Sequence, residues 1–187
     1  KSILMNTNTV NLANGYQVLL LEDVFPVDLY QDLLTLCETA DTGQDWQSAE
    51  WTTLRKIYRG NNKTYLNVQD YLSSKDFTQH IEDILGVNMK FVTADIWADY
   101  PGYGPLLPHC ENSGRGQGQI YITRELQEAN GTAILNNDKE LLFTLPYRGN
   151  FGWYFDECTK IMHSRPRDVV SDTVRYSLIF WHDYIKE

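Results

Sequence analysis

Apolar residues recur at two different spacings along the chain, and these spacings predict helices early and strands late. Residues 16–21 form a short apolar run typical of a strand. The leucines of residues 27–39 recur at helical spacing directly after a proline, which suits the first turn of a helix. A second helix is predicted from about Ser74 to Leu85, with Ser74 as its N-cap and Gly86 as its stop. Between them, residues 41–47 are expected to form a polar loop, and residues 51–58 slightly favour a strand.

Beyond Gly86 the pattern changes to short strand candidates separated by Gly, Asn, Asp or Pro. These candidates are residues 91–98, 107–111, 119–123, 132–135, 141–145, 152–155 and 174–181. Closely spaced short strands are typical of an antiparallel sandwich or barrel. With no repeat or linker in sight, we expect a single domain over residues 1–187. It should be mainly β with N-terminal helices: an α-rich support region over 1–90 and a jelly-roll core over 91–187.

Composition and charge narrow the possible partners. Large aromatic rings make up 13% of the 187 residues, enough to build a packed core rather than a disordered chain. The net charge of -9 opposes general binding to nucleic acid, whose phosphates need clustered cations. The nearest approach to a basic cluster is Arg55, Lys56, Arg59 and Lys63, which we interpret as a solvated face. We expect a small-molecule or peptide substrate instead.

The cysteines and the hydropathy pattern bear on the compartment. Cys37, Cys110 and Cys158 are far apart and form no C-x-x-C pair, so neither a disulfide framework nor a thiolate zinc site is indicated. No apolar stretch is long enough to span a bilayer, and no secretory signal is apparent. We therefore expect a cytoplasmic protein that does not bind membranes. The oligomeric state is left open.

The candidate chemistry begins at His109-Cys110-Glu111. In a strand, residues two apart face the same way, so His109 and Glu111 would point together into the barrel. An imidazole and a carboxylate on one face suit a divalent first-row metal, although such a pair often arises by chance. His163 is the possible third ligand. Two imidazoles and one carboxylate form the facial arrangement used for non-haem iron(II), and no obvious fourth ligand closes the site.

Arg175 and Ser177 share one face of the predicted strand 174–181, whose other residues are largely apolar. A buried arginine needs an anionic partner, and its planar fork of donors fits a carboxylate. A salt bridge to Asp or Glu is the simpler explanation. The adjacent serine and the candidate ligands upstream favour a bound carboxylate ligand.

These residues together resemble the 2-oxoglutarate/iron(II) oxygenase superfamily, including prolyl-hydroxylase-like members of phage or marine-bacterial type. The resemblance covers about residues 91–182. It rests on the order of DYPGYGPLLPHCE at 99–111, QIYIT at 119–123, GT at 131–132, MHS at 162–164 and RYS at 175–177. It implies a double-stranded β-helix with iron(II) bound by His109, Glu111 and His163.

The resemblance also implies the cosubstrate and the reaction. The distal carboxylate of 2-oxoglutarate would meet Arg175 and Ser177, and Tyr121 matches a strand tyrosine that often contacts the cosubstrate. Oxygen would convert 2-oxoglutarate to succinate while a C–H bond of the substrate is oxidised, with ascorbate as a supporting reductant. Most members have aspartate where this chain has Glu111, a side chain longer by one C–C bond, roughly 1.5 Å.

Several residues near these motifs are candidates for substrate contact. Tyr100 and Tyr103 lie in the Gly- and Pro-rich segment before His109. Arg165 and Arg167 follow His163 and could hold an anionic substrate, or they could belong to a solvated loop. Residues 112–118, with several glycines, could form a lid or an inert connection.

Two other interpretations of the sequence remain. The chain could be a jelly-roll binding protein whose metal is structural or absent. It could also be a metal-dependent isomerase of the cupin type, which would not require a buried Arg175. A peptidyl proline, a free amino acid and another small metabolite all remain open as substrates.

Overall fold

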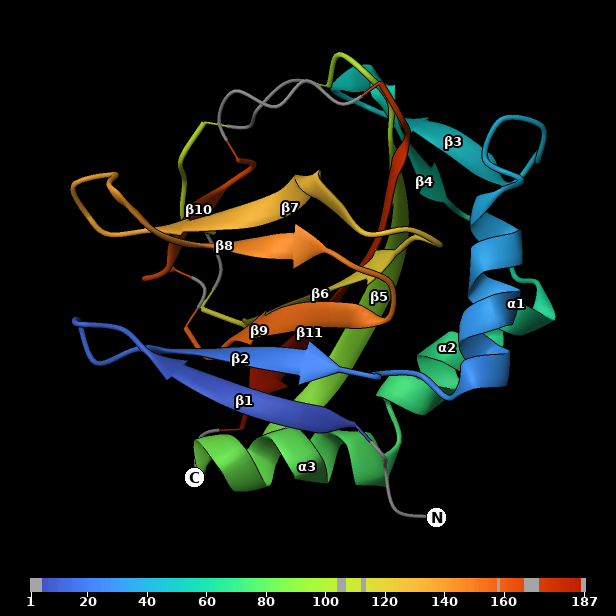
Figure 1. Cartoon of the computed structure of the whole chain (residues 1–187). Coiled ribbons are helices and arrows are strands. Elements are labelled where there is room, and N and C mark those ends of the chain that lie inside the picture. The colour runs from blue at the N-terminus through green and yellow to red at the C-terminus, as the bar shows by residue number, and fades with distance from the viewer. Residues whose placement is uncertain (1–4, 104–106, 112–113, 158, 167–171, 186–187) are drawn as a thin grey trace.

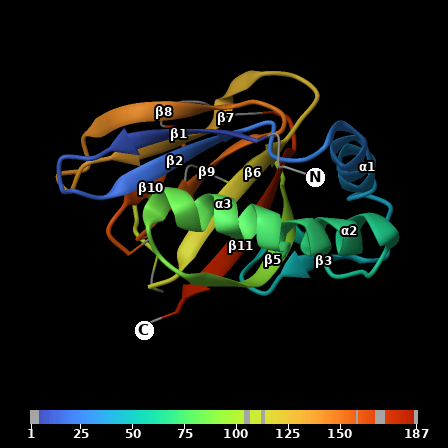
Figure 2. The ribbon, with the colours of Figure 1, turned by 90° about the horizontal axis from the view of Figure 1, so that it is seen from below.

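Two antiparallel sheets packed face to face form the centre of the molecule, and helices cover the outer face of the larger sheet (Figures 1 and 2). The computed structural model describes residues 5–103, 107–111, 114–157, 159–166 and 172–185. Across the larger sheet the strands are β1 (Asn6–Asn11), β2 (Gln17–Glu22), β9 (Phe151–Phe155), β6 (Gly116–Ile122), β11 (Arg175–Tyr184), β5 (Met89–Asp99), β4 (Thr52–Tyr58) and β3 (Trp46–Ala49). Across the smaller sheet they are β10 (Met162–Ser164), β7 (Gln127–Leu135) and β8 (Leu141–Tyr147). This arrangement confirms the predicted jelly roll, mainly β with N-terminal helices.

The smaller sheet is extended by one further residue, His109. Its N–H donates to the carbonyl of His163 at 3.0 Å, and the N–H of His163 donates back at 2.9 Å. The prediction of a strand over residues 107–111 is wrong, because only His109 pairs. Pro108 before it has no N–H to donate, and Glu111 has already left the extended pairing. The backbone thus brings the two histidines side by side although they are far apart in sequence.

The helices are α1 (Val27–Cys37), α2 (Lys63–Leu72) and α3 (Lys75–Leu85), and α1 and α3 confirm the two predicted helices. The hydroxyl of Ser74 accepts the N–H of Phe77 at 3.3 Å, and Gly86 ends α3 in the left-handed region with φ 67°. Helix α2 was not predicted, although Asn62 caps it by accepting the N–H of Tyr65. None of the described helices is long and apolar enough to cross a membrane.

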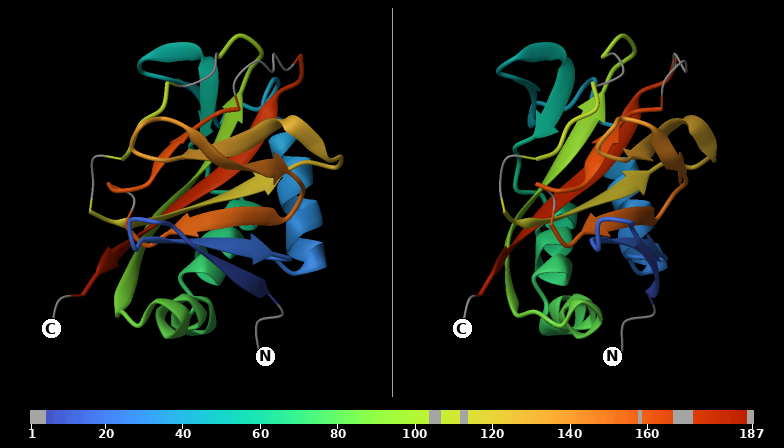
Figure 3. Two further views of the ribbon diagram at one scale, coloured as in Figure 1. Left: turned by 60° about the vertical axis from the view of Figure 1, so that its left-hand side comes forward. Right: turned by 90° about the vertical axis from the view of Figure 1, so that its left-hand side faces the viewer.

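The strands of the larger sheet have two chemically different faces. The face toward the helices is apolar, with Leu178 and Phe180 of β11 fully buried beside Ile120 of β6. Gly118 lies opposite Phe180 in the neighbouring strand, and an added Cβ there would overlap the phenyl ring. The face toward the smaller sheet carries polar side chains from the same strands. Figure 3 shows this interior, where the two sheets lie opposite each other.

Most strand predictions overlap the observed strands, and the misses have physical causes. β1 consists almost wholly of Asn and Thr at the sheet edge, so it lacks an apolar signal. β10 is only three residues long, and β3 begins at Trp46 inside the expected polar loop. The expected loop over 112–118 is shorter than predicted, because Gly116 already starts β6. Residues 112–113 lie outside the described residues.

Candidate active site

His109, Glu111 and His163 converge at one end of the interior between the sheets. Their ligand atoms all lie within 4.8 Å of one another. The Oε1 atom of Glu111 is 3.6 Å from Nε2 of His109 and 3.3 Å from Nε2 of His163. Two ligands about 2.1 Å from an ion and at right angles to each other would be about 3.0 Å apart, so the donor spacing fits a shared metal. Glu111 reaches both imidazoles from outside the strand pairing.

The orientation of both imidazoles also fits metal binding. Nδ1 of His109 is 2.9 Å from the carbonyl of Leu107, and Nδ1 of His163 is 3.2 Å from the carbonyl of Ile161. A carbonyl can only accept, so each ring carries its proton on Nδ1 when neutral and presents the lone pair of Nε2 toward Glu111. Metal-binding histidines are commonly oriented in this way.

Electrostatics in this cluster favour a carboxylate that stays ionised. The hydrogen bonds to His109 and His163 hold the pKa of Glu111 well below its usual range, against the effect of burial. The same contact with Glu111 raises the pKa of His109. A divalent ion would take the place of the proton that Glu111 favours on His109, because a metal binds the neutral imidazole and the ionised carboxylate.

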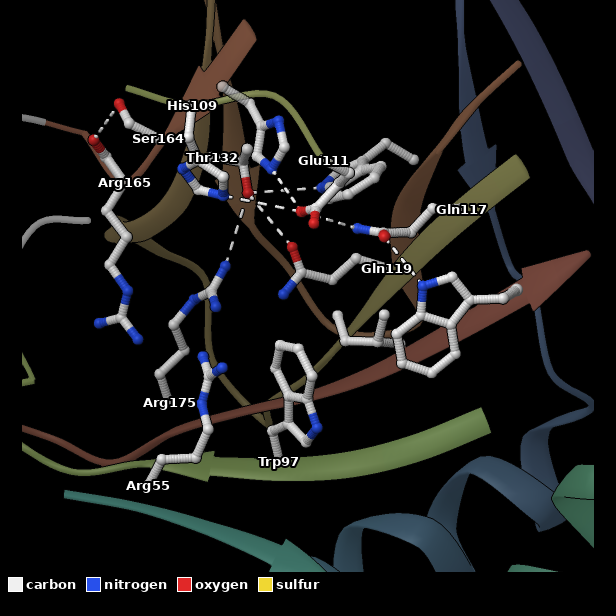
Figure 4. A pocket seen from close by; sticks show the side chains of 14 residues that line it. Arg55, Trp97, His109, Glu111, Gln117, Gln119, Thr132, Ser164, Arg165 and Arg175 are labelled. Atoms are coloured by element: carbon white, nitrogen blue, oxygen red, sulfur yellow. Dashed lines mark hydrogen bonds and ion pairs between the residues drawn. The ribbon is translucent and has the colours of Figure 1, made fainter. Parts of the chain in front are cut away.

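Behind Glu111 lies a chain of hydrogen bonds that the sequence did not reveal. Nε2 of Gln117 donates to Oε1 of Glu111 at 3.3 Å, and Nε1 of Trp181 donates to Gln117 at 2.9 Å (Figure 4). Gln117 lies in β6 and Trp181 in β11, so neighbouring strands of the larger sheet orient the carboxylate. The signal in the sequence was the pair of glutamines two positions apart in β6, Gln117 and Gln119.

Arg175 lies in the same cavity as the metal-ligand candidates, and its side chain is only 5% exposed. Its Nε donates to the carbonyl of Asn130 at 2.6 Å, and its Nη2 lies 3.5 Å from the hydroxyl of Thr132. Figure 4 shows the guanidinium group directed toward Thr132, on the side where the metal-ligand candidates lie. Arg175 can therefore offer donors to an anion inside the cavity.

Ser177 and Tyr121 lie close to this position but are fully buried. The hydroxyl of Ser177 accepts the side-chain N–H of Gln119 at 3.0 Å. The hydroxyl of Tyr121 donates to Thr132 at 2.5 Å, and the guanidinium of Arg175 is 5.4 Å from the centre of the Tyr121 ring. Gln119 and Thr132 line the cavity in front of them. The structure thus brings Ser177 and Tyr121 next to the expected cosubstrate position, behind these two side chains.

Three arginines surround a buried aspartate, Asp99, beside the cavity. Arg55 donates two hydrogen bonds to the Asp99 carboxylate, through Nε at 2.5 Å and Nη2 at 2.9 Å. Nη2 of Arg165 donates a third, at 2.5 Å. Nη1 of Arg175 is 3.7 Å away, too long for a hydrogen bond. Burial and the positive charges of Arg175 and Arg55 lower the pKa of Arg165 to about 10, against the opposing effect of Asp99.

This cluster corrects the interpretation of Arg55 as part of a solvated face. Arg55 is 5% exposed and stacks on Trp97, whereas Arg59 of the same segment is an exposed partner of Asp95. Arg55 lies within β4 and its side chain is buried, whereas Arg59 follows the end of β4 at Tyr58 and is no longer held by the strand. Arg55 points inward because it pairs with the buried Asp99. In the sequence, Asp99 stands out only as the first residue of the segment that leads to His109.

The candidate substrate residues separate into two groups. Tyr103 lies over Arg55 and Arg165, with ring-to-guanidinium distances of 4.6 and 5.6 Å. Tyr100 points elsewhere: its hydroxyl donates to Asp41, and its ring packs against the helix-side core. The expectation of substrate contact by Tyr100 therefore has no support in its position. Arg167 lies outside the described residues.

The cavity that these side chains line has a volume of about 240 Å³. That is slightly below the roughly 300–1,000 Å³ of typical small-molecule pockets. One end carries the two imidazoles and the carboxylate, and another side carries the guanidinium groups (Figure 4). A ligand that chelates a metal at one end and carries a carboxylate at the other matches this division.

Comparisons with known proteins identify the class of fold. No protein-family model matches the chain, and no curated protein matches it in sequence. Among solved structures, a Pseudomonas putida prolyl-4-hydroxylase matches with TM-score 0.65 and 15% identity, covering 90% of this chain and 93% of that one. A Trichoplax adhaerens prolyl hydroxylase in complex with a hypoxia-inducible-factor peptide matches with TM-score 0.65 and 9% identity, covering 88% and 82%.

A third similar structure has hygromycin B bound rather than a peptide. HygX from Streptomyces hygroscopicus, with nickel, 2-oxoglutarate and hygromycin B bound, matches with TM-score 0.63 and 10% identity, covering 88% of this chain and 82% of that one. The chain therefore has the fold of the 2-oxoglutarate/iron(II) oxygenases. The resemblance that the sequence motifs suggested is confirmed at the level of the fold.

Proposed function

We propose that the protein is a non-haem iron(II), 2-oxoglutarate-dependent dioxygenase that hydroxylates an amino acid, free or within a peptide. One observation carries the proposal. Two Nε2 atoms and one carboxylate oxygen, with both rings oriented by backbone carbonyls, share a cavity with a buried arginine. Two structures with this fold contain 2-oxoglutarate together with iron or nickel, which supports the proposed metal and cosubstrate.

His109, Glu111 and His163 would hold the metal, leaving its other positions free for ligands. Arg175 would bind the distal carboxylate of 2-oxoglutarate by charge-assisted hydrogen bonds, which are stronger than neutral ones. Ser177 and Tyr121 lie behind the cavity wall and would orient Gln119 and Thr132, the side chains that line it. When bound, iron and 2-oxoglutarate supply an oxidant from O₂, releasing succinate and carbon dioxide.

Other side chains of the cavity hold the metal-ligand candidates in position. Gln117 fixes one oxygen of Glu111, so that the carboxylate does not rotate away from the histidines. Trp153 stands against the ring of His163, with centroids 5.8 Å apart, and limits its movement. Trp97, Trp153 and Ile179 line the cavity beside its polar groups and exclude part of the water, which strengthens the electrostatic interactions inside.

The test is succinate release from 2-oxoglutarate with added iron(II), ascorbate and O₂. Enzymes of this class often turn over slowly without their substrate, so the assay works even when the substrate has not been identified. We expect succinate from the parent protein and none above background from His163→Ala. A folded, iron-loaded parent that releases no succinate would favour a non-catalytic jelly-roll binding protein instead.

A further inference from the structure

The arginines around Asp99 leave a surplus of positive charge beside the candidate active site. The Asp99 side chain is 0% exposed, and those of Arg55, Arg165 and Arg175 are 6%, 13% and 5% exposed. Among the described residues that line the cavity, Glu111 alone carries a negative charge. Because the protein interior penalises an unpaired ion, these guanidinium groups indicate anions that bind here.

The proposed cosubstrate accounts for only part of this surplus, and this step rests on the proposed function. Glu111 and the chelating carboxylate of 2-oxoglutarate would balance a divalent ion. The distal carboxylate would balance Arg175, and Asp99 balances one of the other two arginines. One positive charge remains, shared between Arg55 and Arg165. Among the described residues no carboxylate besides Glu111 lines the cavity, so we expect the substrate that is to be oxidised to neutralise this charge.

Hydrogen bonding identifies Arg165 as the arginine with unused donors. Arg55 donates two hydrogen bonds to Asp99, through Nε and Nη2, and its guanidinium is stacked 3.8 Å from the centre of the Trp97 ring. Arg165 makes one bond to Asp99, through Nη2. Its buried Nε finds no acceptor among the described residues, and the same holds for Nε1 of Trp97 in the same cavity. A buried donor without an acceptor destabilises the fold, and a ligand oxygen would satisfy it.

We propose that Arg165 binds a carboxylate group of the substrate, and that the substrate is therefore a small carboxylic acid such as a free amino acid. The Tyr103 ring, 5.6 Å from the Arg165 guanidinium, would form one wall of this subsite. The cavity of about 240 Å³ must also hold the cosubstrate, which favours a small acid. An internal peptide residue without an acidic side chain carries no carboxylate and would leave Nε of Arg165 without a carboxylate acceptor.

The experiment is an NMR titration that observes the side-chain N–H signals of Arg165 and Trp97 directly. The protein carries zinc(II) in place of iron(II) and is saturated with 2-oxoglutarate, so that Arg175 is already engaged. Acetate is then added as the carboxylate probe, and acetamide as its neutral counterpart. We expect acetate to shift the Arg165 Nε–H signal saturably and acetamide to leave it unchanged.

Variants then locate the response. Arg165→Gln should weaken acetate binding, measured at the Trp97 indole signal, by about tenfold or more, the loss of at least one charge-assisted hydrogen bond. Arg59→Gln, at an exposed arginine paired with Asp95 outside the cavity, should bind acetate like the parent. The proposal is overturned if acetate causes no saturable shift, if acetamide acts equally, or if Arg165→Gln responds like the parent.

The 2-oxoglutarate step of the same titration separates this inference from the proposed function. If 2-oxoglutarate fails to bind the zinc-loaded protein, the proposed function fails, and the acetate response at Arg165 is still measured on its own. If 2-oxoglutarate binds but acetate does not, only the carboxylate subsite is rejected. Because the parent protein reports directly on Arg165, the result does not depend on the folding of any variant.

Discussion

The two faces of β11 differ in role: one packs into the hydrophobic core, and the other faces the candidate active site. Toward the helices the strand presents Leu178 and Phe180 and then His182, all fully buried among aromatic and aliphatic side chains. Toward the smaller sheet it presents Arg175 and Ser177, also buried, but among hydrogen-bonding groups. Burial of the apolar face stabilises the fold by excluding water, whereas burial of polar groups on the other face costs free energy. The difference teaches that burial alone does not distinguish core from site, and that the partners of each side chain do.

The largest expected effect is on the apolar face. Leu178→Ala should lower the free energy of unfolding by about 2–5 kcal/mol, because it opens a cavity between the sheet and the helices. The matched control is Leu141→Ala at a residue 62% exposed, which should change stability by about 0.5 kcal/mol or less. Urea denaturation measures both. Equal losses in the two variants would contradict the placement of the core on this face.

The second prediction concerns His182, the one histidine of β11, which lies on the apolar face. It packs between Phe77 and Phe91, and burial lowers its pKa to about 4. The unfolded chain binds a proton here below about pH 6.5, whereas the folded chain does not, so stability falls as the pH drops from about 6.5 toward 4. The loss should total on the order of 3 kcal/mol at pH 4.

The matched variant is His182→Phe, which removes the titrating group and keeps a ring in the aromatic cluster. Denaturation curves at several pH values should show a shallower decline of stability for this variant than for the parent. The carboxylates that also lose stability in acid are common to both proteins and cancel in the difference. Identical pH profiles would show that His182 titrates alike in the folded and unfolded chains.

On the polar face, Arg175→Ala should weaken 2-oxoglutarate binding roughly ten- to hundredfold, through the loss of at least one charge-assisted hydrogen bond. Arg175→Lys should restore only part of the affinity, since an ammonium lacks the planar fork. Arg124→Ala, at an exposed arginine paired with Glu38, is the control and should bind like the parent. Calorimetry with the metal-loaded protein measures the three. An unchanged affinity in Arg175→Ala would move the cosubstrate site elsewhere.

The smallest effect should come from Ser177→Ala. The serine hydroxyl accepts a hydrogen bond from Gln119 and stands behind the cavity, so its removal should weaken 2-oxoglutarate binding by less than about tenfold. Metal affinity, measured by competition with a chelator, should stay the same. A loss as large as that of Arg175→Ala would show that Ser177 contacts the cosubstrate directly.

The sequence predicted the parts of this fold whose chemistry is local. The N-cap Ser74, the stop at Gly86 and the apolar runs of β2, β5 and β11 carry their own signals. Strand β10 carries no such signal, because it has only three residues, and helix α2 was missed although Asn62 caps it. Such elements depend on tertiary packing, which a pattern along the chain does not encode.

The candidate site shows the same difference between local sequence signals and contacts that depend on tertiary structure. The order of the motifs singled out His109, Glu111, His163 and Arg175, and the structure brings all four to one cavity. The expected reason for Glu111 was wrong: the residue lies outside the strand and reaches the histidines by its longer side chain. Asp99 and Arg55 were overlooked as a site pair, because their contact joins neighbouring strands that are distant in sequence.

The most direct test of the central claim is an anaerobic titration of 2-oxoglutarate into the iron(II)-loaded protein, followed by visible absorption. Chelation of iron(II) by a 2-oxo acid gives a metal-to-ligand charge-transfer band. We predict that this band grows saturably in the parent protein and is absent from His163→Ala, whose unfolding curve serves as the control for its fold. A folded, iron-loaded parent without the band, or a band of equal strength in His163→Ala, would contradict the assignment of His109, Glu111 and His163 as the metal site.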